Sequence, residues 1–262
     1  MKEKSILPGG ETYDVRGPKK MLEKLKGNPT LAKKVAEGAV GRAEDIVESG
    51  RLTERIKKND VVVYFGTGTG HVAKEIEKQT GAKVFKFDLA DLRTPDTKDD
   101  RFALANARQM PLADNAVDVV CLFDILHHTK NQDEILKEAL RVLKPGGRCL
   151  IMEDTIPESF DETMLASVRK FLAPKSDDLF NAQPSGVNPH GYHSVSDWEL
   201  IAHDLGFAVD ANTTNSWHWG VPDFLGSSRK TRPAQPSYVR PMQATMFEFK
   251  KPEPNIKKPT QK

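Results

Sequence analysis

Hydrophobic and polar residues follow two different patterns along the chain, and the change between them divides it. Between residues 19 and 56, apolar positions recur at helical spacing, as in Leu31, Val35 and Val40, which predicts two or three helices. From Val61 onward, short apolar runs alternate with helical stretches. The predicted strands span 61–65, 83–87, 102–105, 117–122, 148–152, 207–214 and 244–250. The predicted helices between them span 71–80, 131–143, 162–172 and 196–206, the last opened by a capping box at Ser196–Glu199. This alternation predicts an α/β fold with a Rossmann-like, doubly wound and mostly parallel sheet.

The same patterns predict the domain organisation. Residues 1–58 read as an N-terminal helical cap, with an irregular beginning, and residues 59–250 as one α/β domain. That domain contains an insert at about 174–195 and a lid-like loop at about 216–242. The basic, proline-containing tail 251–262 is expected to be disordered.

Composition narrows the class of protein. The 262 residues carry a net charge of only +2, which gives no electrostatic case for nucleic acid or an anionic membrane. The longest apolar runs are too short to span a bilayer, and the first residues contain no hydrophobic signal core. Cys121 and Cys149 both lie in strand-like runs. We therefore expect buried, reduced thiols in a cytoplasmic protein, rather than a disulfide between neighbouring strands.

The stretch VVVYFGTGTGHVAKEI places Gly66, Gly68 and Gly70 between a strand and a helix. Glycine permits positive φ and lets backbone N–H groups approach a ligand closely. A phosphate loop is excluded because no Gly-Lys-Ser/Thr follows. Asp88 ends the second strand about 20 residues later, where a carboxylate accepts the ribose hydroxyls of an adenosine cofactor. Both features also fit a nicotinamide cofactor, because Ala73 satisfies the looser dinucleotide pattern.

Two further stretches separate these cofactors. ANARQMPLADNAVDVVCLFDILHH, residues 105–128, and ILKEALRVLKPGGRCLIMED, residues 135–154, resemble the class I S-adenosylmethionine-dependent methyltransferases. The resemblance covers residues 61–152 well and is greatest to the branch that contains quinone-biosynthesis and related small-molecule methyltransferases. It implies seven strands with an antiparallel last strand, S-adenosylmethionine as cofactor, and methyl transfer to a small-molecule acceptor. The K-P-G-G segment argues against a nicotinamide-dependent oxidoreductase, which is the less favoured alternative.

The resemblance also implies roles for residues that match the family. Gly66, Gly68 and Gly70 would pass beneath the methionyl part of the cofactor, and Asp88 would hold the ribose hydroxyls. Contacts with the adenine or the methionyl group are implied for Leu89, Asn106, Ala107 and Phe123. Tyr64 departs from the family, which usually has an acidic residue there to help place the charged end of the cofactor. A non-catalytic partner protein of the same fold therefore remains a third hypothesis.

No catalytic residue is assigned by the sequence, because a base is needed only when the acceptor must lose a proton. The candidates are His127, which follows the fourth strand, Glu153, which follows the fifth, and His193, which precedes a capped helix. No metal site is expected, since the histidine spacing matches no known ligand signature. Carbon, oxygen and nitrogen acceptors all remain open, and the sequence carries no signal for an oligomeric state.

Overall fold

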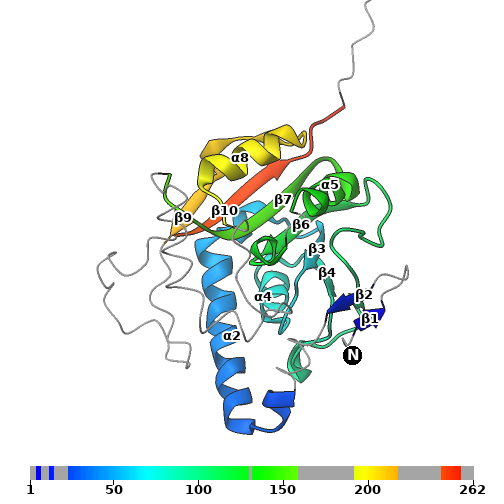
Figure 1. Cartoon of the computed structure of the whole chain (residues 1–262), viewed down its shortest axis with the longest axis vertical. Coiled ribbons are helices and arrows are strands. Elements are labelled where there is room, and N and C mark those ends of the chain that lie inside the picture. Colours follow the sequence, from blue (N-terminus) through cyan, green and yellow to red (C-terminus); the bar gives the residue numbers. More distant parts are fainter. Residues whose placement is uncertain are drawn as a thin grey trace, which may run out of the picture.

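The computed structural model describes residues 4–6, 12–14, 23–129, 132–158, 192–217 and 243–254, and Figure 1 shows their arrangement. Its centre is one mixed sheet. The described strands of this sheet are β3 (Val61–Phe65), β4 (Lys83–Asp88), β5 (Phe102–Leu104), β6 (Val117–Phe123), β7 (Leu143–Thr155), β8 (Ala208–Val209), β9 (Asn215–Trp217) and β10 (Gln243–Lys250). They follow the order β5-β4-β3-β6-β7-β10-β8, and β9 also pairs with β10.

The strand directions confirm the predicted fold class. The five strands from β5 to β7 are parallel, whereas β10 runs antiparallel to β7 over eight residue pairs. The strand order reverses between β3 and β6. In open α/β sheets, ligands bind at such a switch point, outside the carboxyl ends of the strands. We call the line formed by the carboxyl ends of β4, β3, β6 and β7 the carboxyl edge.

Helices cover both faces of the sheet. One buried cluster joins the sheet to α2 (Pro29–Ser49), α3 (Leu52–Arg55) and α4 (His71–Thr80). The other joins it to α5 (Gln132–Val142) and α8 (Val195–Asp204). Each helix buries one apolar stripe against the sheet. The sheet is therefore packed on both faces, and its carboxyl edge rests on two buried clusters.

The helix α2 corrects the predicted helix boundaries. It is one helix of 21 residues, so Leu31 and Ile46 lie on the same helix rather than on two. The Asn28 side chain caps it by accepting a 2.9 Å hydrogen bond from the backbone of Leu31. It ends before Arg51, whose φ of 52° lies in the left-handed region. Figure 1 shows that its first turns extend well beyond the sheet, and Val40 remains 43 % exposed.

The capping box of α8 begins two residues earlier than predicted. Ser194 is the N-cap: its Oγ accepts from the Asp197 backbone, and the Asp197 carboxylate accepts from the Ser194 backbone, both at 3.1 Å. The Ser196 hydroxyl instead donates to Glu158 at 2.6 Å. Sequence pattern alone did not distinguish two serines that are each followed three residues later by an acidic side chain.

Two strand predictions also change. The predicted strand 207–214 is divided into β8 and β9 by the 3₁₀ turn η3 (Ala211–Thr213), because Asp210 caps that turn through the backbone of Asn212. Consequently the sixth predicted strand counts as two. The expected irregular start instead contains a short hairpin of β1 (Lys4–Ile6) and β2 (Thr12–Asp14).

Some of the predicted segments lie wholly or partly outside the residues that the structure describes. The predicted helix 162–172 and most of the insert and the lid-like loop lie outside them. Within the predicted disordered tail, Lys251 is held by its Nζ, which donates to the Leu143 carbonyl at 2.8 Å. Cys121 and Cys149 are buried free thiols on β6 and β7, as predicted. Among the described residues, no helix combines the length and apolar character needed to cross a bilayer.

Candidate functional site

The glycine turn between β3 and α4 has the backbone that its sequence predicts. Gly66, Gly68 and Gly70 adopt φ values of 74°, 54° and 86°, which side chains rarely tolerate. A Cβ on Gly66 would lie 2.1 Å from Ile125 Cγ2, so the loop after β6 packs directly on the turn. A Cβ on Gly68 would meet no described atom nearer than the Gly66 carbonyl at 4.0 Å. The space above Gly68 is therefore open to a ligand.

Asp88 lies beside the turn, at the carboxyl end of β4. Its Oδ2 accepts a 2.8 Å hydrogen bond from the Gly68 backbone, and its Oδ1 accepts one of 2.7 Å from Leu89. Burial raises the pKa of the Asp88 carboxyl, and these backbone bonds oppose the shift. A carboxylate oriented in this way can accept further hydrogen bonds from a ligand hydroxyl. The glycine turn and Asp88 thus form one unit.

The loop from Ala90 to Asp100 is hydrogen-bonded to the other side of the glycine turn. The Thr97 hydroxyl donates to the Thr69 carbonyl at 2.7 Å, and the Thr94 backbone donates to the same carbonyl at 3.2 Å. A Cβ on Gly70 would lie 2.6 Å from Thr97 Oγ1, so glycine is required for this contact. The turn is fixed before any ligand arrives.

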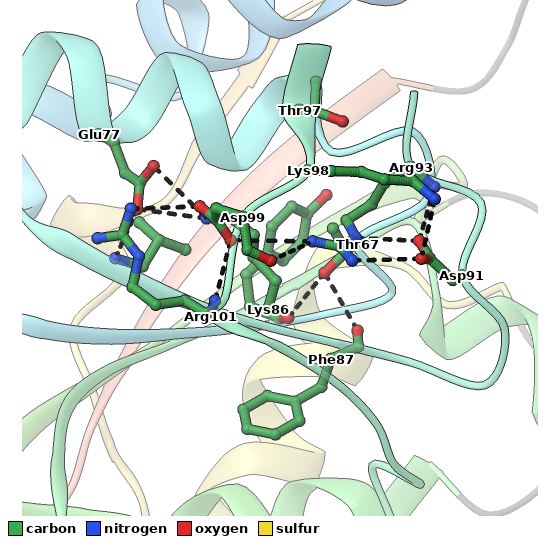
Figure 2. A network of polar contacts seen from close by, with 12 residues as sticks. Thr67, Glu77, Lys86, Phe87, Asp91, Arg93, Thr97, Lys98, Asp99 and Arg101 are labelled. Atoms are coloured by element: carbon green, nitrogen blue, oxygen red, sulfur yellow. Dashed lines mark hydrogen bonds and ion pairs between the residues drawn. The ribbon is translucent and has the colours of Figure 1, made fainter. Parts of the chain in front are cut away.

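A network of ion pairs joins this loop to Glu77 of α4 and Lys86 of β4 (Figure 2). Lys86 on β4 is 1 % exposed, and its Nζ lies 2.5 Å from Asp99 Oδ2 and 3.4 Å from Glu77 Oε1. Arg93 donates to the Asp99 carbonyl at 3.0 Å and pairs with Asp91 at 2.9 Å. A buried ammonium is stable only when carboxylates surround it, so Lys86 requires this loop conformation.

The residues expected near the adenine occupy the same end of the carboxyl edge. Asn106 follows β5, and its Oδ1 accepts a 3.0 Å hydrogen bond from the Arg108 backbone. Leu89 and Ala107 are half-buried. Phe123, which was expected near the methionyl group instead, is buried at the end of β6, on the other side of β3. The Asn106 side chain thus also shapes its own turn, a use that the sequence did not indicate.

Tyr64 lies inside the core beneath the turn. It is 4 % exposed and packs against Phe123 with ring centroids 5.3 Å apart. Burial raises the pKa of its phenol, so the hydroxyl stays neutral. Tyr64 therefore supplies no negative charge to the carboxyl edge.

Arg42, in the second half of α2, forms an ion pair with Asp124, the residue that follows β6. Asp124 has a φ of 53°, and its backbone N–H donates to the Met152 carbonyl at 2.8 Å. Arg42 also lies close enough to Tyr64 and Asp154 to interact with them electrostatically. The pair brings a charged residue from the N-terminal helix to the carboxyl edge.

The structure brings two of the three candidate catalytic residues together. His127 Nδ1 and Glu153 Oε2 are 2.5 Å apart. The other oxygen of Glu153 accepts hydrogen bonds from the backbones of Ile125 and Leu126, at 3.0 and 2.7 Å. Glu153 is 1 % exposed, and the ring of Tyr192 stacks on His127 with centroids 5.2 Å apart. A carboxylate held in this way accepts from Nδ1–H and orients the imidazole, which places the basic lone pair on Nε2.

His193 has different neighbours. Its Nε2 lies 2.8 Å from Gln132 Oε1, and the Gln132 amide donates to the Leu126 carbonyl at 3.1 Å. Its ring meets Trp198 edge-on at 4.8 Å. His193 therefore supports the loop that carries His127. No cluster of three or more potential metal ligands occurs within the described ranges.

Comparison with known proteins identifies the central part of the chain. Residues 63–151 match the family model described as a methyltransferase domain. This stretch of the chain is a methyltransferase domain. The match spans the glycine turn, Asp88, all of β6 and β7 as far as Ile151, and it supports the predicted family.

Curated relatives give the same assignment. Methyltransferase GfsG of Streptomyces halstedii is 29 % identical over 145 residues, which cover 49 % of this chain and 52 % of GfsG. The ubiquinone/menaquinone biosynthesis C-methyltransferase UbiE of Pseudomonas putida (strain GB-1) is 31 % identical over 153 residues, covering 48 % of this chain and 60 % of UbiE. The chain thus spans little more than half the length of these relatives.

Solved structures share the fold of this methyltransferase domain. The YcgJ protein of Bacillus subtilis superposes with a TM-score of 0.57 at 17 % identity, over 78 % of this chain and 97 % of that one. A Haemonchus contortus phosphoethanolamine N-methyltransferase, solved with S-adenosylhomocysteine, gives 0.54 at 17 % identity, over 80 % of this chain and 53 % of that one. These likenesses show that the fold is shared, and the methyltransferase-domain match supports S-adenosylmethionine as the cofactor.

The methyltransferase domain fits this cofactor by its own geometry. The open space above Gly68 and the oriented Asp88 carboxylate provide a cradle for a nucleoside at the switch point of the sheet. Asp88 would hold the ribose hydroxyls, and the glycine turn would lie under the rest of the molecule. When bound, the cofactor supplies an electrophilic methyl group on a sulfonium.

Three contributors to the site carried no usable sequence signal. Arg42 is one of many charged residues on a helix, and nothing in its spacing points to Asp124. Gln132 opens α5, where it reads as an ordinary first-turn residue. Lys86 lies in the middle of a strand, where an alternating pattern predicts solvent exposure rather than burial.

Proposed function

We propose that this chain is an enzyme that transfers the methyl group of S-adenosylmethionine to a small-molecule acceptor, with His127 as the base. The observation that carries the proposal is the contact between His127, in the loop after β6, and Glu153, near the end of β7. The same loop packs on the glycine turn through Ile125. Glu153 has no solvent access of its own and serves to orient and charge-stabilise the imidazole.

An imidazole base indicates which acceptors suit the site. A nucleophile whose proton must leave, such as a phenol, a hydroquinone or an acidic carbon, needs a group to receive that proton. His127 Nε2 would receive it, and Glu153 would stabilise the resulting imidazolium. The relationship to UbiE, a ubiquinone/menaquinone biosynthesis C-methyltransferase, agrees with this chemistry. We extend the proposal to a cytoplasmic protein that acts without nucleic acid or metal.

The first test is calorimetric binding of S-adenosylmethionine and S-adenosylhomocysteine, with NAD as control. We expect micromolar binding of the first two and none of NAD. If neither adenosyl ligand binds, the proposal fails and a non-catalytic partner protein replaces it. Binding of NAD alone would favour the oxidoreductase alternative.

The second test measures transfer of labelled methyl to phenolic, hydroquinone and amine acceptors. In the His127→Asn variant we expect kcat to fall about 10²- to 10⁴-fold, as for loss of a general base. The affinity for S-adenosylhomocysteine should stay within about twofold, since His127 lies on the acceptor side. In Glu153→Gln the kcat should fall as well, with a shifted pH–rate profile. Unchanged rates in both variants would remove the base assignment but not the methyltransferase assignment.

A further inference from the structure

The open question about the cofactor site is which residues hold the charged end of the ligand, since Tyr64 is buried and neutral. S-adenosylmethionine carries an α-ammonium and an α-carboxylate at the end opposite its adenosine. Two opposite charges close together on a ligand require two opposite charges, or equivalent dipoles, on the protein.

The sheet itself indicates where that end must lie. Asp88, which would hold the ribose, lies at the end of β4, and β3 with its glycine turn separates β4 from β6. Neighbouring strands are about 4.8 Å apart, so the end of β6 lies about 10 Å from that of β4. An extended ligand that crosses the glycine turn from Asp88 therefore reaches the residue that follows β6. That residue is Asp124.

The charges at this position match such a ligand. Asp124 is paired with Arg42, and Asp154 lies nearby. The carboxylate of Asp124 suits an ammonium, and the guanidinium of Arg42 suits a carboxylate in a bidentate contact. The three side chains sum to a net charge of −1, and S-adenosylmethionine carries a net charge of +1.

Anchoring of α2 does not account for this pair. The two side chains are 45 % and 24 % exposed, and exposed ion pairs contribute about 1 kcal/mol at most. The helix is already held by buried Ala43, Ile46 and Val47, and by the Asn215 amide, which donates to the Ser49 carbonyl at 2.8 Å. In addition, Asp124 holds a left-handed backbone, which few non-glycine residues adopt.

We propose that Arg42 and Asp124 form the clamp for the amino-acid end of the cofactor, with Arg42 on its carboxylate and Asp124 on its ammonium. The inference rests on the proposed function, because it deepens the same site. The charge that the family usually supplies from the first strand would here come from the N-terminal helix and the end of β6.

The test compares ligands that differ only in this end, measured by calorimetry on the full chain. S-adenosylhomocysteine contains both charged groups, whereas 5′-methylthioadenosine lacks them. We expect Arg42→Met to weaken S-adenosylhomocysteine about tenfold or more, as for a lost hydrogen bond to a charged group, and to leave 5′-methylthioadenosine within about twofold. Decarboxylated S-adenosylmethionine should lose affinity in Asp124→Asn but not in Arg42→Met.

A matched control is Arg51→Met, which removes another exposed arginine–carboxylate pair, that with Glu54, away from the carboxyl edge. It should change no ligand affinity. If Arg42→Met weakens both ligands equally, or neither, the clamp is wrong. If wild-type protein binds no adenosyl ligand, the proposed function fails instead. If Arg42→Met does not fold, Arg42→Lys replaces it. The wild-type protein is then also compared for its affinity for S-adenosylmethionine and for the decarboxylated form. The clamp requires tighter binding of S-adenosylmethionine, and equal affinities would overturn the proposal.

Discussion

The two halves of the carboxyl edge are built in different ways. At the ends of β4 and β3 the site consists largely of backbone, with the glycine turn, Asp88 and the loop 90–100 bound to one another by short hydrogen bonds. At the ends of β6 and β7 it consists of side chains, namely Asp124, His127 and Glu153, which are oriented by partners from distant elements. In the proposed site, the nucleoside end of the cofactor would thus be held mainly by backbone, whereas its amino-acid end and the acceptor would be held by side chains.

The largest expected effect separates two glycines of the backbone half. Gly66→Ala places a Cβ against Ile125 and strains a positive φ, so it should cost about 2 to 5 kcal/mol of stability. Gly68→Ala meets open space and should cost only about 1 to 2 kcal/mol. Urea denaturation measures both. Equal losses would show that Ile125 moves freely and that the turn is not rigid.

The same pair sharpens the binding argument. Because the open space above Gly68 is where the ligand would lie, the folded Gly68→Ala protein should bind S-adenosylhomocysteine at least about tenfold more weakly. Calorimetry on that variant tests this. Unchanged affinity would place the cofactor elsewhere.

The next effect concerns the ion pairs beneath the loop. Lys86→Met leaves Glu77 and Asp99 without their buried cation, and should cost about 2 to 3 kcal/mol because both carboxylates keep some water contact. Lys74→Met, which removes an exposed pair with Asp96, is the matched control and should cost less than about 1 kcal/mol. Thermal unfolding of the two variants compares them. Similar melting temperatures would mean that the buried lysine is replaceable.

Asp88 gives a prediction in pH. Only the ionised carboxylate accepts both ribose hydroxyls, so affinity for S-adenosylhomocysteine should fall as the pH drops through the raised pKa of Asp88. Calorimetry between about pH 7.5 and about pH 4.5 measures this. Asp88→Asn should bind about 10- to 100-fold more weakly at neutral pH and lose this pH dependence. A dependence that persists in Asp88→Asn would assign it to another group.

The stability of the free protein should change in the opposite sense. The pKa of Asp88 is higher in the folded than in the unfolded protein. The protonated carboxyl therefore contributes to the free energy of unfolding at low pH, and this contribution is lost as the pH rises through the folded-state pKa. The difference in unfolding free energy between wild type and Asp88→Asn, followed with pH, checks the sign.

The smallest effect lies in the side-chain half. Ser194→Ala removes the N-cap of α8, next to His193, and should cost about 1 kcal/mol. Ser196→Ala removes a surface hydrogen bond and should cost less than about 0.5 kcal/mol. Chemical denaturation ranks them. The reverse order would restore the capping box to Ser196.

The sequence predicted most of the backbone half and little of the side-chain half. The backbone half is built from local motifs, and their spacing in the sequence predicts the backbone geometry. These motifs are formed by Gly66, Gly68, Gly70 and Asp88. Arg42 reaches Asp124 across 82 positions, and only the packing of α2 on the sheet brings them together. The meeting of His127 with Glu153 is intermediate: both positions followed from strand ends, but their 2.5 Å contact depends on the order of β6 and β7.

The helix boundaries failed for a related reason. Although α2 contains Gly38 and Gly41, burial of Ala43, Ile46 and Val47 holds it as one continuous helix. Tertiary packing there exceeds the modest cost of about 1 kcal/mol that a glycine imposes on a helix.

The position of β10 has a consequence for how the chain folds. This strand covers the outer edge of β7 over its last eight positions, although Thr155 and Gln243, which are paired, lie 88 residues apart. Until the C-terminal strand has been synthesised, β7 presents a long unpaired edge and the buried thiol of Cys149 lacks its cover of Phe249. Pairing of β10 thus ends the exposure of the β7 edge and of the Cys149 thiol during synthesis. Until then, pairing of β7 with another chain and oxidation of the thiol compete with folding.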